Sequence, residues 1–496
     1  MKISLRLLVV IFWAAMMFWL YNRDIKTGEF LNYQDVIDPD NLIRNEWMTV
    51  SMQGGTIGVV NSRMDINENS RVHRYVIEDV AELHLNLMGN QQSLDIEVRT
   101  LLDVDMTLQA FECLVETSLY PIRIQGRRYD GDVFDISTST RGERRHKRVK
   151  IPRDSMINNP FAENTLASLA VGDIRAVRYF DPLEAREQTV TIEAVEATTI
   201  ERNGESQPVT RMIARSQGDQ TEYWVNKKGR IVRQHRKTFD WVIEQCTFEE
   251  AQAALRMPAS GEDLLRAVSI PVNNIAHARS RDTLHLRLHG VTLQPDMLTS
   301  PRQTIAEVGH QMYDITINKR AAPQPATSSK ELSIHRMPTD FIQSRHPDVI
   351  RTAKRIVGNE VTPAKQARLL ADWVHKNMTR QNAMSIPSTI DVLRTMKGDC
   401  NEHTYLFVGL ARALGIPAKV KVGLVYMEGA FFYHAWPAYY ADGWIENDPT
   451  LGQHIADATH IAFTEGEISQ QLTIVRLMGR LSIESFDKPH PVHDHD

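Results

Sequence analysis

The sequence predicts an α+β protein in which an antiparallel, β-rich N-terminal part precedes a separate C-terminal domain of helices and strands. Apolar and polar residues alternate through much of 46–250, as at Leu83, Leu85 and Leu87, and this period is typical of half-buried antiparallel strands. A stretch rich in Ala, Pro and Ser at 321–329 precedes a change to the apolar period of amphipathic helices. With 496 residues, the chain has room for about three domains.

The composition is that of an ordinary globular protein. Lysine and arginine number 57 against 62 aspartates and glutamates, so the net charge of −5 gives no reason to expect a nucleic-acid partner. The three cysteines, Cys113, Cys246 and Cys400, are too few and too scattered for a disulfide scaffold or a zinc finger. We expect no cofactor and no metal ion.

Residues 1–22 differ from the rest of the chain. Lys2 and Arg6 precede an apolar run from Leu7 to Tyr21, and no Ala-x-Ala cleavage pattern follows it. This pattern predicts an uncleaved membrane anchor with its N-terminus inside. The expected location is the inner membrane, single-pass, with the bulk of the chain extracytoplasmic (periplasmic). The alternative is a buried N-terminal helix.

The β-rich part divides into two segments and a linker. Residues 46–260 form the first segment, in which Asp130-Gly131 and Lys228-Gly229 are turn dipeptides between candidate strands, as in a series of hairpins. Residues 261–320 form a second, smaller β-rich segment. Residues 321–337 are predicted to be a linker because of their composition.

Residues 338–486 are predicted to form the C-terminal domain. A helix from Asp348 ends at Gly358, and another begins at Thr362-Pro363. Helices followed by strands indicate a separate α+β domain. Residues 487–496 form a His-rich tail, which is expected to be a solvated terminus rather than a metal chelator.

Cys400 is the first candidate for chemistry. Asp399 can cap a helix and Glu402 can complete a capping box, so Cys400 falls at the first helical position. The helix dipole and the free backbone N–H groups there favour a thiolate over a thiol, and the same amides could stabilise an oxyanion. The alternative is a small apolar cysteine at a helix start.

His434 and Asp448 are the other two candidates. They lie on two predicted strands around the turn Asp442-Gly443, equally far from Ala441 along the chain, so they should lie nearly opposite each other. A carboxylate beside an imidazole fixes its tautomer and keeps it basic. With Cys400 they would supply a nucleophile, a base and an orienting acid.

Two other histidine and tryptophan patterns leave alternatives open. His403, three residues after Cys400, could be the base, and the two residues could be a metal pair, although zinc would need further ligands. Trp436 and Trp444 could form walls of the site, or could simply pack.

Outside this region, two features have both a structural and a functional interpretation. Cys113 and Cys246 could pair in an oxidising compartment, or remain core thiols. The basic run at 141–153 is expected to be an exposed strand or loop, and it could contact anionic lipid or wall polymer.

Four blocks of sequence resemble the bacterial transglutaminase-like superfamily. They are GDCNEH at 398–403, ARALGIP at 411–417, YHAW at 433–436 and DPT at 448–450, and the likeness covers roughly 338–486. The resemblance implies a papain-like α+β fold with Cys400 as nucleophile, His434 as general base and Asp448 as orienting acid. With YWV at 223–225, KGR at 228–230 and FEEA at 248–251, the N-terminal part resembles the β domain that often precedes this core in exported bacterial members.

The expected function is that of a transglutaminase-like cysteine peptidase or acyltransferase. It would act on amide bonds of proteins or cell-wall peptides through a Cys thioester, by hydrolysis or transamidation. The expected partners are a protein or peptide substrate and the membrane, through the N-terminal segment. The alternative is a non-catalytic envelope binding or assembly module that uses the papain-like groove. A third hypothesis makes the β domain a ligand carrier.

Overall fold

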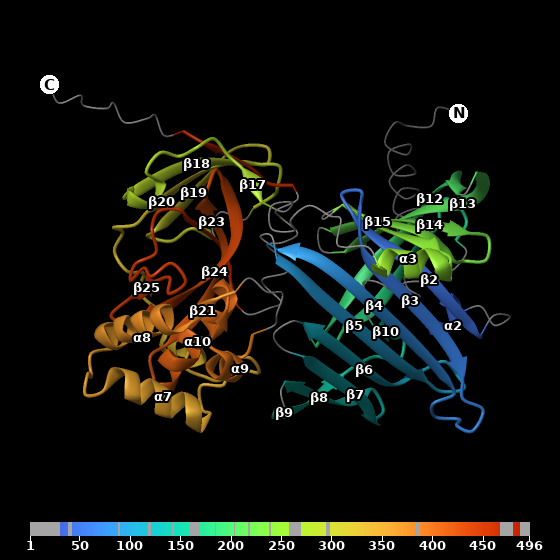
Figure 1. Cartoon of the computed structure of the whole chain (residues 1–496), viewed down its shortest axis with the longest axis horizontal. Helices are drawn as coiled ribbons and strands as arrows, with labels where there is room; N and C mark the ends of the chain where they lie inside the picture. The colour runs from blue at the N-terminus through green and yellow to red at the C-terminus, as the bar shows by residue number, and fades with distance from the viewer. Residues whose placement is uncertain are drawn as a thin grey trace, which may run out of the picture.

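Strands dominate the N-terminal half of the chain, and most helices lie in the C-terminal half (Figure 1). The predicted anchor, 1–22, and the predicted tail, 487–496, lie outside the residues that this computed structural model describes. The described residues are 30–37, 42–87, 90–117, 121–140, 143–157, 169–183, 185–202, 204–216, 219–237, 240–256, 269–293, 298–381, 387–466 and 480–486.

One 16-stranded sheet forms the N-terminal part, in the order β1-β11-β12-β13-β14-β15-β16-β2-β3-β4-β5-β6-β7-β8-β9, with β10 paired to β11. Its elements are β1 (Phe30–Leu31), α2 (Tyr33–Val36), β2 (Arg44–Met52), β3 (Gly55–Ile66), β4 (Tyr75–Leu87), β5 (Asn90–Leu102), β6 (Leu108–Thr117), β7 (Ile122–Asp130), β8 (Val133–Thr140), β9 (Glu143–Lys150), β10 (Ser155–Ile157), β11 (Ile174–Asp181), β12 (Arg186–Arg202), β13 (Glu205–Ser216), β14 (Asp219–Asn226), β15 (Ile231–Arg236), β16 (Trp241–Cys246) and α3 (Phe248–Arg256).

The predicted hairpins of this part are confirmed. Strands β7 and β8 meet at Asp130-Gly131, and β14 and β15 meet at Lys228-Gly229. Gly131 and Gly229 have φ values of 50° and 76°, a backbone conformation that glycine adopts without steric cost. The alternating strand pattern therefore produces a meander of antiparallel pairs.

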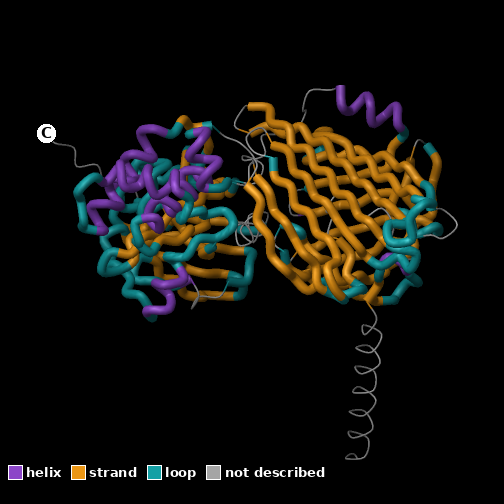
Figure 2. Tube along the Cα trace, turned by 90° about the horizontal axis from the view of Figure 1, so that it is seen from below, coloured by secondary structure: helices purple, strands orange, loops and turns teal. Residues whose placement is uncertain are grey.

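The sheet curls so that strands far apart in its order pack against each other, as Figure 2 shows. Phe111 of β6 lies against Phe180 of β11, with ring centroids 5.8 Å apart. The concave side is filled by buried apolar side chains such as Leu83 and Phe134. Helix α3 covers part of the sheet, where Phe248 meets Trp47 edge to face. The curled sheet thus encloses a core of its own.

Strand β9 lies at one end of the strand order, and among the described residues it pairs with β8 alone. It carries most of the basic run at 141–153, and its side chains are mostly exposed. Arg145 and Val149 are half-buried, and Arg145 donates to the carbonyl oxygen of Thr339 at 2.5 Å in the C-terminal part. Lys147 lies 3.9 Å from Asp340. Part of the basic run is therefore in contact with the second half of the chain.

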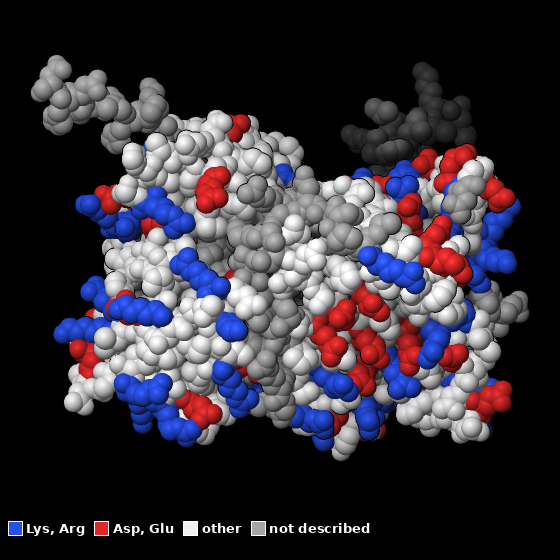
Figure 3. All heavy atoms as spheres, in the orientation of Figure 1, with Lys and Arg blue, Asp and Glu red and all other residues white. Residues whose placement is uncertain are grey.

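Carboxylates gather over the N-terminal sheet on the face shown in Figure 3, whereas Lys and Arg prevail on the C-terminal part. The strand register places Glu82 opposite Asp95 and Asp95 opposite Glu116, a row of three acids across β4, β5 and β6. Burial and then Glu116 raise the pKa of Asp95. The two halves thus differ in charge on the face that Figure 3 shows.

The C-terminal part is α+β, so the predicted fold class is confirmed. Its elements are β17 (Ile270–Pro271), the 3-10 helix η2 (Ala278–Ser280), β18 (Thr283–His289), β19 (Gln303–Gly309), β20 (Met312–Asn318), α6 (Ser329–Ile334), α7 (Pro347–Val357), α8 (Pro363–Asn377), β21 (Thr379–Arg380), α9 (Thr389–Thr395), β22 (Lys397–Gly398), α10 (Cys400–Ala413), β23 (Ala418–Met427), β24 (Ala430–Tyr440), β25 (Trp444–Glu446), β26 (His460–Glu465) and β27 (Ser482–Ser485).

The small β-rich segment shares one hydrophobic core with the C-terminal helices. Strands β18, β19, β20 and β27 form a four-stranded sheet, and β17 joins the five-stranded sheet built on β23 and β24. The core runs continuously from residues of β18, such as Leu286, to Phe407 in α10. The segment predicted as a linker is also held here, because Trp444 donates its backbone N–H to the carbonyl oxygen of Gln324 at 2.7 Å.

The predicted inner-membrane location is wrong. Within the described ranges, we find no helix whose length and apolar character would suffice for a membrane span.

Candidate active site

Helix α10 begins as its sequence predicts. Asp399 is its N-cap and accepts from the backbone N–H of Asn401 at 2.9 Å, while Glu402 accepts from the backbone N–H of Asp399 at 2.8 Å. Gly398 precedes the cap with φ of 146°, and the Glu402 side chain fills the space that a Cβ would occupy there. The capping box therefore holds Cys400 at the first helical position.

The start of α10 packs against a stretch of the β24 edge that pairs with neither β17 nor β25. On that edge of β24, strand β17 pairs with Ala430 and Phe431, and β25 pairs from Ala438 onward. Between them, the backbone of Ala435 bonds to α10 instead: its N–H donates to the Cys400 thiol, and its carbonyl oxygen accepts from the Thr404 hydroxyl at 3.0 Å. The thiol thus lies beside the residue that follows His434.

The structure brings His434 and Asp448 together. Their Nε2 and Oδ2 atoms are 2.8 Å apart, and the side chains are 5% and 0% exposed. The other carboxylate oxygen of Asp448 accepts from the backbone N–H groups of Thr450 and Leu451. Burial alone would raise the pKa of Asp448, but the imidazoles beside it hold that pKa well below the usual range. Asp448 is therefore a carboxylate at neutral pH.

The register of the hairpin differs from the predicted one. Tyr440 pairs with Trp444, so the hairpin is centred on Asp442 and not on Ala441. Asp448 lies beyond the end of β25, in a turn where its backbone exchanges two hydrogen bonds with Gln453. A side chain in this turn still reaches the imidazole of His434.

The expected thiolate preference of Cys400 is reversed. Removal of the thiol from water, and then the negative charge of Asp399, raise the pKa of Cys400 well above its ordinary value. Cys400 is therefore a neutral thiol at neutral pH, and a base must take its proton for it to become a nucleophile.

His403 is fully buried and is turned toward its own helix start. Its Nδ1 lies 2.6 Å from the carbonyl oxygen of Asp399, and burial lowers its pKa. Its Nε2 has no hydrogen-bond partner within the described residues. His403 thus lacks the carboxylate contact that His434 has.

The two candidate tryptophans have different positions. Trp436 stacks on His434 with centroids 6.0 Å apart, and its Nε1 donates to Glu446 at 2.8 Å. Trp444 instead donates to Glu331 and lies under the ammonium of Lys419. Only Trp436 is part of the wall around His434.

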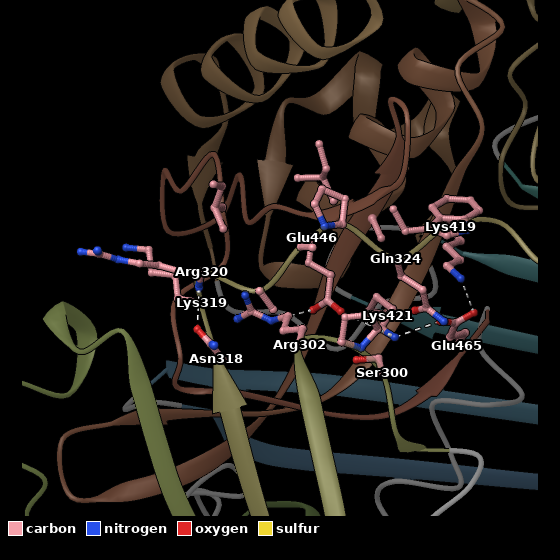
Figure 4. Close-up of a pocket in the computed structure, with 18 residues that line it drawn as sticks. Ser300, Arg302, Asn318, Lys319, Arg320, Gln324, Lys419, Lys421, Glu446 and Glu465 are labelled. Atoms are coloured by element: carbon pink, nitrogen blue, oxygen red, sulfur yellow. Dashed lines mark hydrogen bonds and ion pairs between the residues drawn. The ribbon is translucent and has the colours of Figure 1, made fainter.

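Glu446 and Trp444 also line a cavity of about 210 Å³ between the two sheets (Figure 4). Arg302 and Lys421 flank Glu446 at 3.4 and 3.8 Å, and Lys421 also pairs with Glu465 at 2.9 Å. Cys400, His434 and Asp448 do not line this cavity.

His460 was missed by sequence reasoning. It lies at the start of β26, and its Nε2 is 3.1 Å from the same Asp448 oxygen that His434 contacts. The alternation of apolar residues in β26 could have indicated a strand, but no turn or motif ties His460 to Asp448.

Within the part of the chain that the structure describes, one set of side chains has ligand atoms close enough to hold a metal ion: those of His434, Asp448 and His460 lie within 4.8 Å of one another. The separations of 2.8 and 3.1 Å are those of N–H···O hydrogen bonds to one carboxylate oxygen. Hydrogen bonds therefore account for the cluster. Cys400 and His403 do not belong to it.

All three cysteines are free thiols, so Cys113 and Cys246 are not paired. Burial raises the pKa of Cys113 to about 12 and that of Cys246 to about 11.

Comparison with known proteins identifies the domain that holds this site. Residues 350–449 match the family model of the Transglutaminase-like superfamily. The chain carries a transglutaminase-like domain. Cys400, His434 and Asp448 all lie within the matched residues.

A curated protein of Haemophilus influenzae, described as uncharacterized, is 37% identical over 91 residues. The match covers 17% of this chain and 23% of that protein, less than a quarter of its length.

Two solved structures have a low overall similarity to this chain. A chain from Cytophaga hutchinsonii, described as a candidate cysteine protease, has 14% identity and a TM-score of 0.30, over 45% of this chain and 89% of that one. The periplasmic domain of TgpA from Pseudomonas aeruginosa has 13% identity and a TM-score of 0.25, over 54% of this chain and 70% of that one. TM-scores this low give these two structures no weight for function.

Proposed function

We propose that the transglutaminase-like domain is a cysteine enzyme that opens amide bonds of proteins or peptides through a thioester on Cys400. The observation that carries the proposal is the position of the Cys400 thiol at Ala435, directly after His434, whose imidazole is hydrogen-bonded to the buried Asp448. Nucleophile, base and orienting acid are the three groups that such chemistry requires.

The tautomer of His434 follows from its partner. Because Asp448 is ionised, Nε2 of His434 carries the ring proton, and this N–H donates a hydrogen bond to the carboxylate. Nδ1 is then the ring nitrogen with a free lone pair, and it takes the proton of the Cys400 thiol. The base is needed because burial keeps this thiol protonated.

The first half of the reaction forms the acyl-enzyme. The Cys400 sulfur attacks the carbonyl carbon as its proton passes to His434, and the C–N bond then breaks as His434 returns that proton to the leaving amine. The capping box occupies the amides of Asn401 and Glu402, which leaves the backbone N–H of Cys400 to stabilise the oxyanion.

The second half releases the acyl group. Water or an amine gives a proton to His434 and attacks the thioester carbon, the C–S bond breaks, and the sulfur recovers the proton. Water gives hydrolysis, and an amine gives transamidation.

The test measures both outcomes on one protein substrate. We expect wild-type protein to release dye from labelled casein, or to incorporate dansylcadaverine into dimethylcasein, and Cys400→Ser to lower that rate by at least about 10³-fold. Cys246→Ser, at a half-buried thiol of the N-terminal sheet, is the matched control and should keep the wild-type rate.

A Cys400→Ser variant that retains the wild-type rate would refute the proposal. Absence of both activities in the wild type, together with no hydroxylamine-sensitive acyl adduct on Cys400, would instead favour the non-catalytic binding module.

A further inference from the structure

One carboxylate oxygen at the site serves two histidines. Oδ2 of Asp448 lies 2.8 Å from Nε2 of His434 and 3.1 Å from Nε2 of His460. Asp448 and His460 are at most 1% exposed, so water does not compete for these contacts. The rings of the two histidines are 5.5 Å apart, centroid to centroid.

His460 faces a carboxylate with each of its ring nitrogens. Nε2 meets Asp448, and Nδ1 lies 3.1 Å from Oδ1 of Asp457. A neutral imidazole has one N–H, so its other nitrogen would direct a lone pair at a carboxylate. Only the imidazolium form donates to both acids. Burial disfavours that charge, yet the two acids raise the pKa of His460.

Asp457, like Asp448, is held in place by hydrogen bonds from neighbouring N–H groups. Asp457 accepts from the backbone N–H of Thr459 at 2.9 Å and from the side-chain amide of Gln453 at 2.7 Å. Its carbonyl oxygen accepts from the guanidinium of Arg302. The same guanidinium faces Glu446 at the cavity wall (Figure 4).

These contacts form a closed series that begins and ends at His434. Glu446 accepts a hydrogen bond from Nε1 of Trp436, and the Trp436 indole stacks on the His434 imidazole. Three carboxylates face His460, those of Asp448, Asp457 and Glu446. Arg302 and Arg279 contact Asp457 from its other side. The ring of His434 lies beside the ring of His460.

We propose that His460 is a protonated positioning residue, which fixes Asp448 through an N–H donor and places its positive charge beside the His434 ring. This inference rests on the proposed function. A positive charge on His460 opposes a second one on the His434 ring 5.5 Å away. A neutral His434 is the state that can accept a proton from a neutral Cys400 thiol.

The experiment follows alkylation of Cys400 by iodoacetamide from pH 5 to 10, with the Cys400 peptide quantified by mass spectrometry. His460→Gln keeps a donor but removes the charge, so we expect the acidic midpoint of the rate profile to move up by about one pH unit. A merely structural role would lower the rate at every pH without moving the midpoint, and that result would overturn the proposal.

The substitution Asp457→Asn keeps the proposal testable if the His460→Gln protein does not fold. Asp457→Asn leaves the histidine in place but removes one of the two acids that favour its charge, so the midpoint should move in the same direction by less. In addition, ¹⁵N-histidine NMR at pH 7.5 should show a doubly protonated imidazole in the wild type that is absent in His460→Gln. Absence of that signal in the wild type would also overturn the proposal.

His434→Ala separates this inference from the proposed function. If His434→Ala leaves the alkylation profile of the wild type unchanged, the proposed function fails. If it changes the profile while His460→Gln and Asp457→Asn keep the wild-type midpoint, only the role of His460 fails.

Discussion

Two opposing effects act on the proton of Cys400. The positive end of the α10 helix dipole favours a negative charge by about 0.3–1 kcal/mol at an exposed site. Removal of the thiol from water acts in the opposite sense, and the carboxylates of Asp399 and Glu402 add to it. The second set of effects prevails, so the nucleophile forms only when His434 takes the proton.

Asp399→Asn tests this balance. Asparagine caps a helix about as well as aspartate, so the helix start should remain, but loss of the charge lowers the pKa of Cys400. More thiolate at a given pH should speed alkylation by iodoacetamide at pH 7.5 by up to about tenfold, since one pKa unit is a tenfold change. The measurement is the alkylation rate of the Cys400 peptide, with the melting temperature as a check on folding. A rate equal to or below that of the wild type would contradict this account.

The residues of the site differ in how far sequence alone could predict them. Asp399, Cys400 and Glu402 lie within one turn of a helix, so the capping box is a local signal. The pKa of Cys400 depends instead on what packs over it, which no local pattern reports. His460 contacts Asp448 from a third strand twelve residues away, and no turn fixes that distance.

At the scale of elements, the position of β26 decides whether His460 reaches the site. Strands β23 and β26 approach each other closely at Gly423, where an added Cβ would collide with the carbonyl oxygen of Ile461. Gly423 also pairs with His434 on the other side of β23. One glycine therefore sets the spacing between the two strands that carry the histidines.

Gly423→Ala should push β26 away from β23. We expect a loss of about 1–3 kcal/mol in the free energy of unfolding, as for an overpacked core, together with the same alkylation shift that His460→Gln gives. Urea unfolding and the Cys400 alkylation profile measure the two effects.

The matched control is Gly309→Ala in β19, where the added Cβ meets only the Met312 side chain at 3.6 Å and beyond. Equal effects of the two substitutions would show that the close approach at Gly423 is unimportant.

At the scale of the whole molecule, the described residues form two hydrophobic cores with no residue in common. One core is enclosed by the 16-stranded sheet, and the other joins the small β-rich segment to the C-terminal helices. Alternation and turn dipeptides could predict most of the first sheet because most of its pairs are sequential hairpins, but they could not predict that β16 pairs with β2. The docking of 269–324 on the C-terminal domain could not be predicted, because β17 pairs with a strand about 160 residues later in the chain.

This division predicts which fragments fold. Residues 269–486 should melt cooperatively, whereas 338–486 should not, because the shorter fragment loses the fully buried Leu284, Leu286 and Leu288. Each is worth about 1.5–3 kcal/mol, and their sum approaches the stability of a typical domain. Thermal melts followed by circular dichroism distinguish the two fragments. A cooperative melt of 338–486 would mean that the small β-rich segment is dispensable for the core.

The charge on β9 has a consequence for how copies of this protein behave in concentrated solution. An edge strand presents unpaired backbone groups that can template growth onto a neighbouring chain. Arg144, Lys147, Arg148 and Lys150 are exposed along this edge, so a second β9 docking there would bring like charges face to face. The basic run thus disfavours edge-to-edge pairing of two copies at the β9 end of the strand order.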